Sequence, residues 1–132
     1  MQKSIFREAI TAGPFSIHFC NTNTEMDLRG HCHFAKVFFE FETTGSTGFP
    51  SFEHTHAEII DHLKALTETP FRKSTNEVVL RRLFEFFRSI ELKETLRYRG
   101  TKFRLVAMEL HVRGVPDDIG HADAFTVYKI HE

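Results

Sequence analysis

Three histidines in the first quarter of the chain have the type and spacing that suit a metal ion. His31 and His33 are two residues apart at the start of a strongly alternating segment, and His18 lies in a β-compatible segment before it. In a β-strand, residues i and i+2 project from the same face, so the two rings can converge on one ion. If the earlier segment lies beside this strand, His18 can supply a third nitrogen. Three histidines and an open fourth position are typical of catalytic Zn²⁺, although an H-x-H pair alone is also common on exposed strands.

We expect structural roles for Cys32 and for two further histidines, His54 and His56. Cys32 lies between His31 and His33 and faces the other way in a strand, so we expect a buried, inert thiol. A second H-x-H pair, His54 and His56, lies near a predicted helix start, where this spacing does not place both rings on one face. We interpret that pair as polar residues of a loop or helix cap.

The elements that must position these residues are strands at both ends of the chain and two helices between them. The expected strands are 4–10 continued by 15–20, then 34–42, 101–112 and 124–131, and the expected helices are 57–66 and 75–92. The second helix has the clearest pattern, because Ser74 is followed three residues later by Glu77, the arrangement of a capping box. This order predicts an α+β fold in which two helices pack on one face of a four-stranded antiparallel sheet.

Composition excludes several classes of protein. The chain has 132 residues, of which 41% are hydrophobic and 27% charged, and this predicts one folded domain over residues 1–132. Lys and Arg number 17 against 18 Asp and Glu, which argues against a nucleic-acid partner. No apolar run approaches a membrane span or a signal-peptide core, and two cysteines cannot build a disulfide scaffold, so we expect a cytoplasmic location. Fifteen phenylalanines predict a phenylalanine-rich core.

The order of the motifs resembles the 6-pyruvoyltetrahydropterin synthase / 6-carboxytetrahydropterin synthase family. The motifs are F-S-x-H, a polar loop, H-x-H opening a strand, Asp-His, and S-T-x-E opening a helix, and the resemblance covers roughly residues 15–87. In that family, histidines at the matching positions hold zinc, which here implies His18, His31 and His33. The resemblance also implies the tunnelling fold, a ββααββ domain whose sheet closes into a barrel when subunits join. We therefore expect a homo-oligomer, most simply a hexamer.

The activity that the resemblance implies is a zinc-dependent lyase acting on 7,8-dihydroneopterin triphosphate. Asp61 and His62 match the family's proton-transfer dyad, although the same pair also fits the solvated side of a helix. Ser74, Thr75 and Glu77 match the turn that contacts the pterin, and the capping box explains Glu77 without a ligand.

Two departures from the family pattern concern the catalytic residues. The family's cysteine lies four or six residues before the first histidine of its HGH motif, and those positions hold Asp27 and Glu25 here. Glu25 is the leading substitute and Asp27 the alternative. The family's late strand ends in an acid that anchors the pterin ring, a role that falls to Glu109 unless the matching position is Arg113.

Two other hypotheses follow from these departures. In the first, the protein keeps the fold and the metal but has lost pterin turnover, and serves as a binding or assembly module. In the second, it is a metal-free enzyme that resembles dihydroneopterin aldolase, and the three histidines are incidental. The expected partner in all enzyme hypotheses is a small-molecule pterin.

Overall fold

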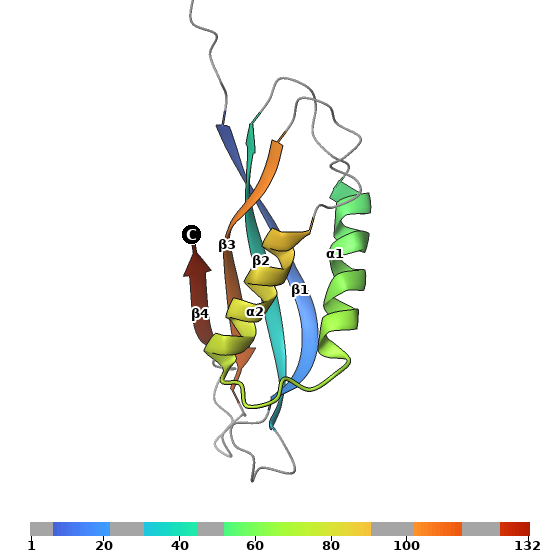
Figure 1. The fold of residues 1–132 in the computed structure, drawn as a ribbon, viewed down its shortest axis with the longest axis vertical. Coiled ribbons are helices and arrows are strands. Elements are labelled where there is room, and N and C mark those ends of the chain that lie inside the picture. The colour runs from blue at the N-terminus through green and yellow to red at the C-terminus, as the bar shows by residue number, and fades with distance from the viewer. Residues whose placement is uncertain (1–6, 22–30, 45–51, 91–101, 115–124) are drawn as a thin grey trace, which may run out of the picture.

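Four strands and two helices make up the part of the chain that the computed structural model describes, which is residues 7–21, 31–44, 52–90, 102–114 and 125–132 (Figure 1). In chain order they are β1 (Arg7–Asn21), β2 (His31–Thr44), α1 (Phe52–Thr67), α2 (Asn76–Ser89), β3 (Lys102–Arg113) and β4 (Phe125–His131). The strands form one sheet in the order β1-β2-β3-β4, and each neighbouring pair is antiparallel. The predicted α+β class, the four-stranded antiparallel sheet and the two helices are confirmed.

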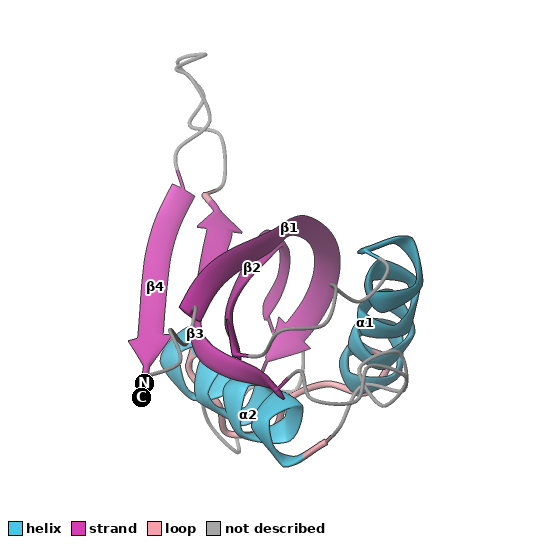
Figure 2. Cartoon of the chain, turned by 90° about the horizontal axis from the view of Figure 1, so that it is seen from above, coloured by secondary structure: helices cyan, strands magenta, loops and turns pink. Residues whose placement is uncertain are grey.

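Alternation along the strands gives the sheet a buried face and an exposed face. On β2, Ala35, Val37, Phe39 and Phe41 are buried in the core with residues of both helices. Figure 2 shows how strongly the sheet curves beside α1 and α2. The opposite face carries the intervening residues of β2, which run from Cys32 to Glu40, and within the described residues it has no helix on it. We call this side the helix-free face.

Phenylalanine rings fill the core, as the composition predicts. Phe39 has no exposed surface and meets Phe15 and Phe87 edge to face, with ring centroids 5.4 and 4.8 Å apart. Phe41 stacks on it at 5.9 Å. Edge-to-face and offset packing are the arrangements that aromatic quadrupoles favour. These contacts join β1, β2 and α2 in one cluster.

The start of α2 differs from the prediction by one residue. Thr75, not Ser74, is the N-cap, and its Oγ1 accepts a hydrogen bond from the Val78 amide at 3.3 Å. Ser74 is buried, and its hydroxyl donates to the Arg72 carbonyl at 2.9 Å. The capping box is therefore not formed, because the residue three positions after the true cap is a valine.

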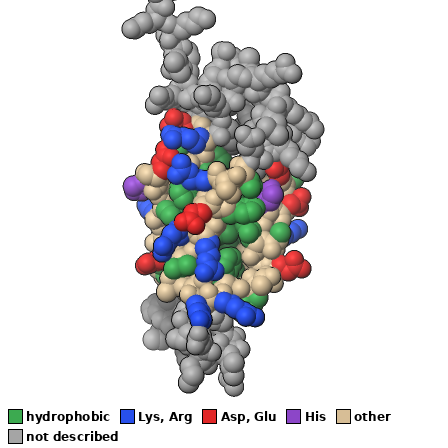
Figure 3. Space-filling view, in the orientation of Figure 1, with side chains coloured by type: hydrophobic (Ala, Val, Ile, Leu, Met, Phe, Trp, Pro, Cys, Tyr) green, Lys and Arg blue, Asp and Glu red, His purple; other side chains and the backbone are tan. Residues whose placement is uncertain are grey.

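The first helix begins earlier than expected, and the outer side of the second is charged. α1 starts at Phe52 instead of residue 57, so His56 lies within it. The exposed side of α2 carries Arg81, Arg82, Glu85 and Arg88, and charged side chains of both signs are interspersed on this side of the molecule (Figure 3). In the described part of the chain, no helix is long and apolar enough to cross a membrane.

Candidate functional site

The pairing of β1 with β2 separates two of the three predicted zinc ligands. His18 lies directly opposite Phe34, and His33 lies directly opposite Phe19. Directly paired residues project from the same face, so His18 is on the helix-free face while His33 is on the side of the core. The ring contacts agree: His18 packs against Phe34 at 4.8 Å, and His33 packs against the fully buried Phe19 at 5.4 Å. This corrects the predicted ligand set, because His18 and His33 cannot converge on one ion within a chain.

Three other predicted site residues have side chains outside the described part of the chain. His31 begins β2, with its backbone paired to Asn21, but its side chain is not among those described. Glu25 and Asp27 both fall within residues 22–30, which are also outside it. The assignment of a proton-transfer carboxylate to this loop stays a prediction.

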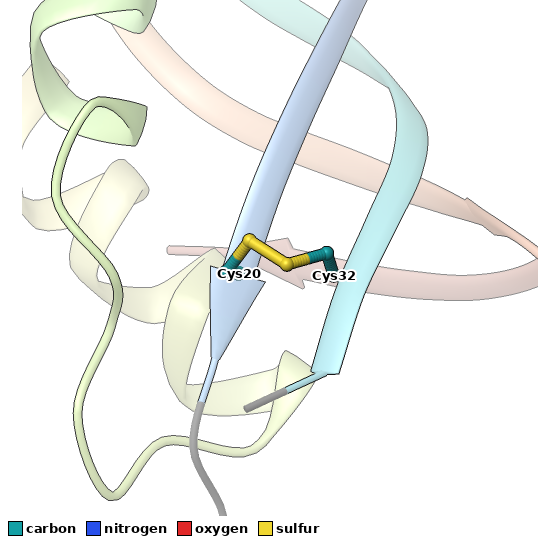
Figure 4. Close-up of a disulfide and its surroundings, with 2 residues drawn as sticks. All are labelled: Cys20 and Cys32. Carbon is teal, nitrogen blue, oxygen red and sulfur yellow. A yellow bond between two sulfur atoms is a disulfide. The ribbon is translucent and has the colours of Figure 1, made fainter. Parts of the chain in front are cut away.

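Cys20 and Cys32 are bonded to each other across β1 and β2 (Figure 4). They lie directly opposite in the register, with Cα atoms 3.9 Å apart. The expectation of a buried, inert thiol at Cys32 is wrong, because Cys32 is exposed and bonded to Cys20. Its side chain does project from the face opposite to that of His33, as expected, but that face is the exposed one. Predicted strand ends could have indicated this pairing, since Cys20 is the second-to-last residue of β1 and Cys32 is the second residue of β2.

The disulfide lies next to His18 and forms with it a group of potential metal ligands. A ring nitrogen of His18 and the sulfurs of Cys20 and Cys32 all lie within 4.8 Å of one another. We call these three residues the His-Cys-Cys group. Thiolates bind metal ions, whereas disulfide sulfurs are poor ligands, so the oxidised group offers only its imidazole.

A cleft of about 930 Å³ runs between β1 and α1, and His18 lines it. The polar residues that line it are His56, Lys64 and Thr67 of α1, Glu68 directly after the helix, and Ser16 and His18 of β1. His56 and Lys64 are eight residues apart and therefore share one side of α1. Sequence reasoning missed the cleft because it placed His56 before the helix, and so did not place it on the same side of α1 as Lys64.

The predicted proton-transfer dyad is arranged differently from the expectation. Asp61 is exposed, whereas His62 is half-buried and packs edge-on against Phe86 and Phe87 at 5.5 and 6.0 Å. The carboxylate beside the His62 ring belongs to Glu58, with Nε2 and Oε2 3.6 Å apart. Neighbouring residues on a helix do not face each other, whereas residues four apart do. Glu58 therefore takes the position expected for Asp61.

The S-T-x-E segment has structural roles at the point where β1 meets α2. The side-chain amide of Asn21 donates to the Ser74 carbonyl at 3.0 Å and to Asn76 Oδ1 at 2.9 Å, which ties the end of β1 to the start of the helix. Ser74 is buried and Thr75 caps the helix, whereas Glu77 is exposed in the first turn. Of the three predicted pterin contacts here, Glu77 is the only carboxylate, and it is accessible to a ligand.

Glu109 lies on the helix-free face in the setting that best fits a ligand anchor. In the register it is opposite Phe38 of β2 and Lys129 of β4. Its Oε2 lies 3.1 Å from Nε2 of His111, and its Oε1 lies 3.3 Å from Nζ of Lys129. The hydrogen bond with His111, and then the bond and charge of Lys129, lower the pKa of Glu109 against the opposing effect of burial. The carboxylate is therefore ionised at neutral pH.

A second cavity, of about 480 Å³, opens over this carboxylate. Its side-chain lining includes Phe38, Glu40, Glu109, Lys129 and His131. Arg113, the alternative anchor position, is exposed at the far end of β3 and does not line the cavity. Of the two alternatives for the anchor, only Glu109 lines this cavity, and the match to the family's anchor stays a prediction.

The Glu109 cavity and the His-Cys-Cys group share the helix-free face but lie far apart. Their partners on β2 are Phe38 and Phe34, four residues or about 13 Å along the strand, and β1 and β3 are about 10 Å apart across the sheet. The resulting distance of roughly 16 Å exceeds the width of a fused two-ring heterocycle. One such ring system cannot touch both within a single chain.

No family model, curated protein sequence or solved structure matches this chain. The resemblance of the motifs to the pterin-synthase family therefore stays a prediction, and the described residues supply the observations on which a function can rest.

Proposed function

We propose that the protein binds a pterin-type heterocycle through Glu109 on the helix-free face. The observation that supports this proposal is an ionised carboxylate at the edge of a cavity that also contains an aromatic ring. A carboxylate can accept two parallel N–H bonds from the amidine-like edge of a pterin, and Phe38 offers a face for stacking. His111 and Lys129 occupy one lone pair on each oxygen and leave the others for a ligand. The choice of a pterin comes from the resemblance, which assigns the anchor to this acid.

Titration with 7,8-dihydroneopterin, followed by ligand fluorescence, tests the proposal. Glu109→Gln keeps the shape of the side chain but replaces an acceptor oxygen by a donor and removes the charge. We expect binding to weaken at least about tenfold, since a hydrogen bond to a charged group contributes roughly 1.5–3 kcal/mol. Glu85→Gln, on the exposed side of α2, is the matched control and should bind as the unmodified protein does. Equal binding by Glu109→Gln, or no binding by the unmodified protein, contradicts the proposal.

A second candidate function is zinc-dependent turnover of 7,8-dihydroneopterin triphosphate, the lyase activity that the resemblance implies. Zinc held by His18, His31 and His33 does not fit the described geometry, because the first and last of these lie on opposite faces. The observation that favours metal chemistry is the His-Cys-Cys group, since imidazole and thiolate are ligands that zinc takes. When bound, zinc would supply a Lewis acid that polarises an oxygen of the substrate. Pterin binding with no turnover by the reduced protein in zinc-containing buffer would favour the binding-module hypothesis instead.

We also propose that copies of the chain associate through the helix-free face. Phe34 is 64% exposed, and Phe125 and Val127 on the same face are about 40% exposed. Association would cover these apolar side chains and could bring Glu109 of one copy near the His-Cys-Cys group of another. The resemblance implies a hexamer. We expect light scattering to give a molar mass several times that of one chain, and a monomer at micromolar concentration contradicts the proposal.

A further inference from the structure

We propose that His18, Cys20 and Cys32 form a Zn²⁺ site that opens and closes with the redox state of the two cysteines. In the reduced protein, two thiolates and one imidazole bind the ion. In the oxidised protein, the disulfide removes both thiolates and zinc is not bound. This inference does not rest on pterin binding, since the site and the Glu109 cavity are separate.

The geometry of the strands already brings the three ligand atoms together. They lie within 4.8 Å of one another in the oxidised protein. Tetrahedral zinc with Zn–S bonds of about 2.3 Å requires sulfurs roughly 3.8 Å apart. Cys20 and Cys32 are directly paired, so rotation of their side chains can reach this separation after the disulfide breaks. Cys32 and His18 are exposed and Cys20 is half-buried, and none of the three belongs to the hydrophobic core.

The ligand types define the ion and the class of site. Two thiolates and an imidazole select zinc over magnesium or calcium, which take oxygen ligands. Three protein ligands leave a fourth position for water or a substrate atom, the arrangement of catalytic zinc. His18 also lines the β1–α1 cleft, together with Lys64 and Glu68. The ion would therefore lie at the border of a cavity large enough for a small polar molecule.

The redox step balances with a dithiol as reductant. The dithiol gives two electrons and two protons to the Cys20–Cys32 bond, which breaks to two thiols, and the reductant closes its own disulfide. Each thiol then loses one proton as its sulfur binds Zn²⁺. Reoxidation by a small-molecule disulfide takes two electrons from the two sulfurs, forms the Cys20–Cys32 bond again and releases the ion, while the oxidant takes up these electrons and two protons from water and becomes a dithiol.

Zinc titration of the full chain against a chromophoric chelator tests this site. We expect one zinc per chain after reduction under anaerobic conditions, and affinity at least about 100-fold weaker for the oxidised protein, because two of three ligands are lost. His18→Ala should weaken binding at least about tenfold. His33→Ala is the matched control and should leave the affinity unchanged, because His33 faces the core side. Cobalt in place of zinc should show a thiolate charge-transfer band in the reduced protein only.

Alkylation of the cysteines gives a second readout that needs no variant. Zinc should protect both thiols of the reduced, unmodified protein from iodoacetamide. Equal zinc affinity in the oxidised and reduced proteins would overturn the proposal, as would reduced protein whose thiols zinc does not protect. Loss of binding in His33→Ala but not in His18→Ala would return the site to the opposite face of the sheet.

Discussion

Replacing Phe39 by alanine is expected to lower the free energy of unfolding by about 4 kcal/mol. The ring has no exposed surface and contacts Phe15, Phe41 and Phe87. Its removal therefore leaves a cavity that these neighbouring aromatic rings cannot fill. The loss is a large part of the 5–15 kcal/mol that typically separates the folded from the unfolded state. Urea denaturation followed by circular dichroism measures it.

Phe34→Ala is the matched control for this core substitution. Phe34 is on the same strand as Phe39 but projects from the helix-free face, where it is 64% exposed. In the dissociated chain we expect it to cost less than about 1 kcal/mol, because a single chain buries little of this side chain. Equal losses for the two variants would contradict the assignment of Phe39 to the buried face of β2 and of Phe34 to the exposed face.

Reduction of the Cys20–Cys32 disulfide is expected to lower the free energy of unfolding by about 3 kcal/mol. The bond closes a loop between residues 12 apart in sequence, and in the chain-entropy account its loss frees the unfolded chain. For a chain of this size, the melting temperature should fall by about 10 °C, which calorimetry with and without a phosphine reductant measures.

The double variant Cys20→Ser/Cys32→Ser separates the disulfide from other effects of reduction. Its melting temperature should be close to that of the reduced protein and should not respond to reductant. Zinc should raise the melting temperature of the reduced, unmodified protein, because a ligand that binds only the folded state stabilises it, but should not raise that of the double variant. An unmodified protein whose melting temperature ignores reductant would contradict the prediction.

The secondary structure was predictable because its signals are local. The alternation over residues 34–42 lies within the single strand β2, and the apolar stripe from Val79 to Phe87 lies within the single helix α2. Boundaries were less accurate where the pattern is weak. Residues 52–56 show no apolar period, so the first turns of α1 were missed.

The pairing register could not be read from the sequence, and the candidate site depends on it. A shift of one residue moves every side chain of a strand to the other face, and β1 contains an irregularity between Ala12 and Phe15. That pairing decides that His18 lies with the cysteines instead of with His33. In the same way, Lys129 comes to Glu109 only through the pairing of β3 with β4, which no local pattern encodes.

The most direct test of the proposed function is to locate the pterin on the protein. Backbone amide shifts of the isotope-labelled chain, recorded by NMR as 7,8-dihydroneopterin is added, report which residues the ligand approaches. Pterin binding through Glu109 predicts the largest changes at Phe38, Glu109 and Lys129 on the helix-free face. Changes confined to His56 and Lys64 of the β1–α1 cleft, or no changes at all, would contradict it.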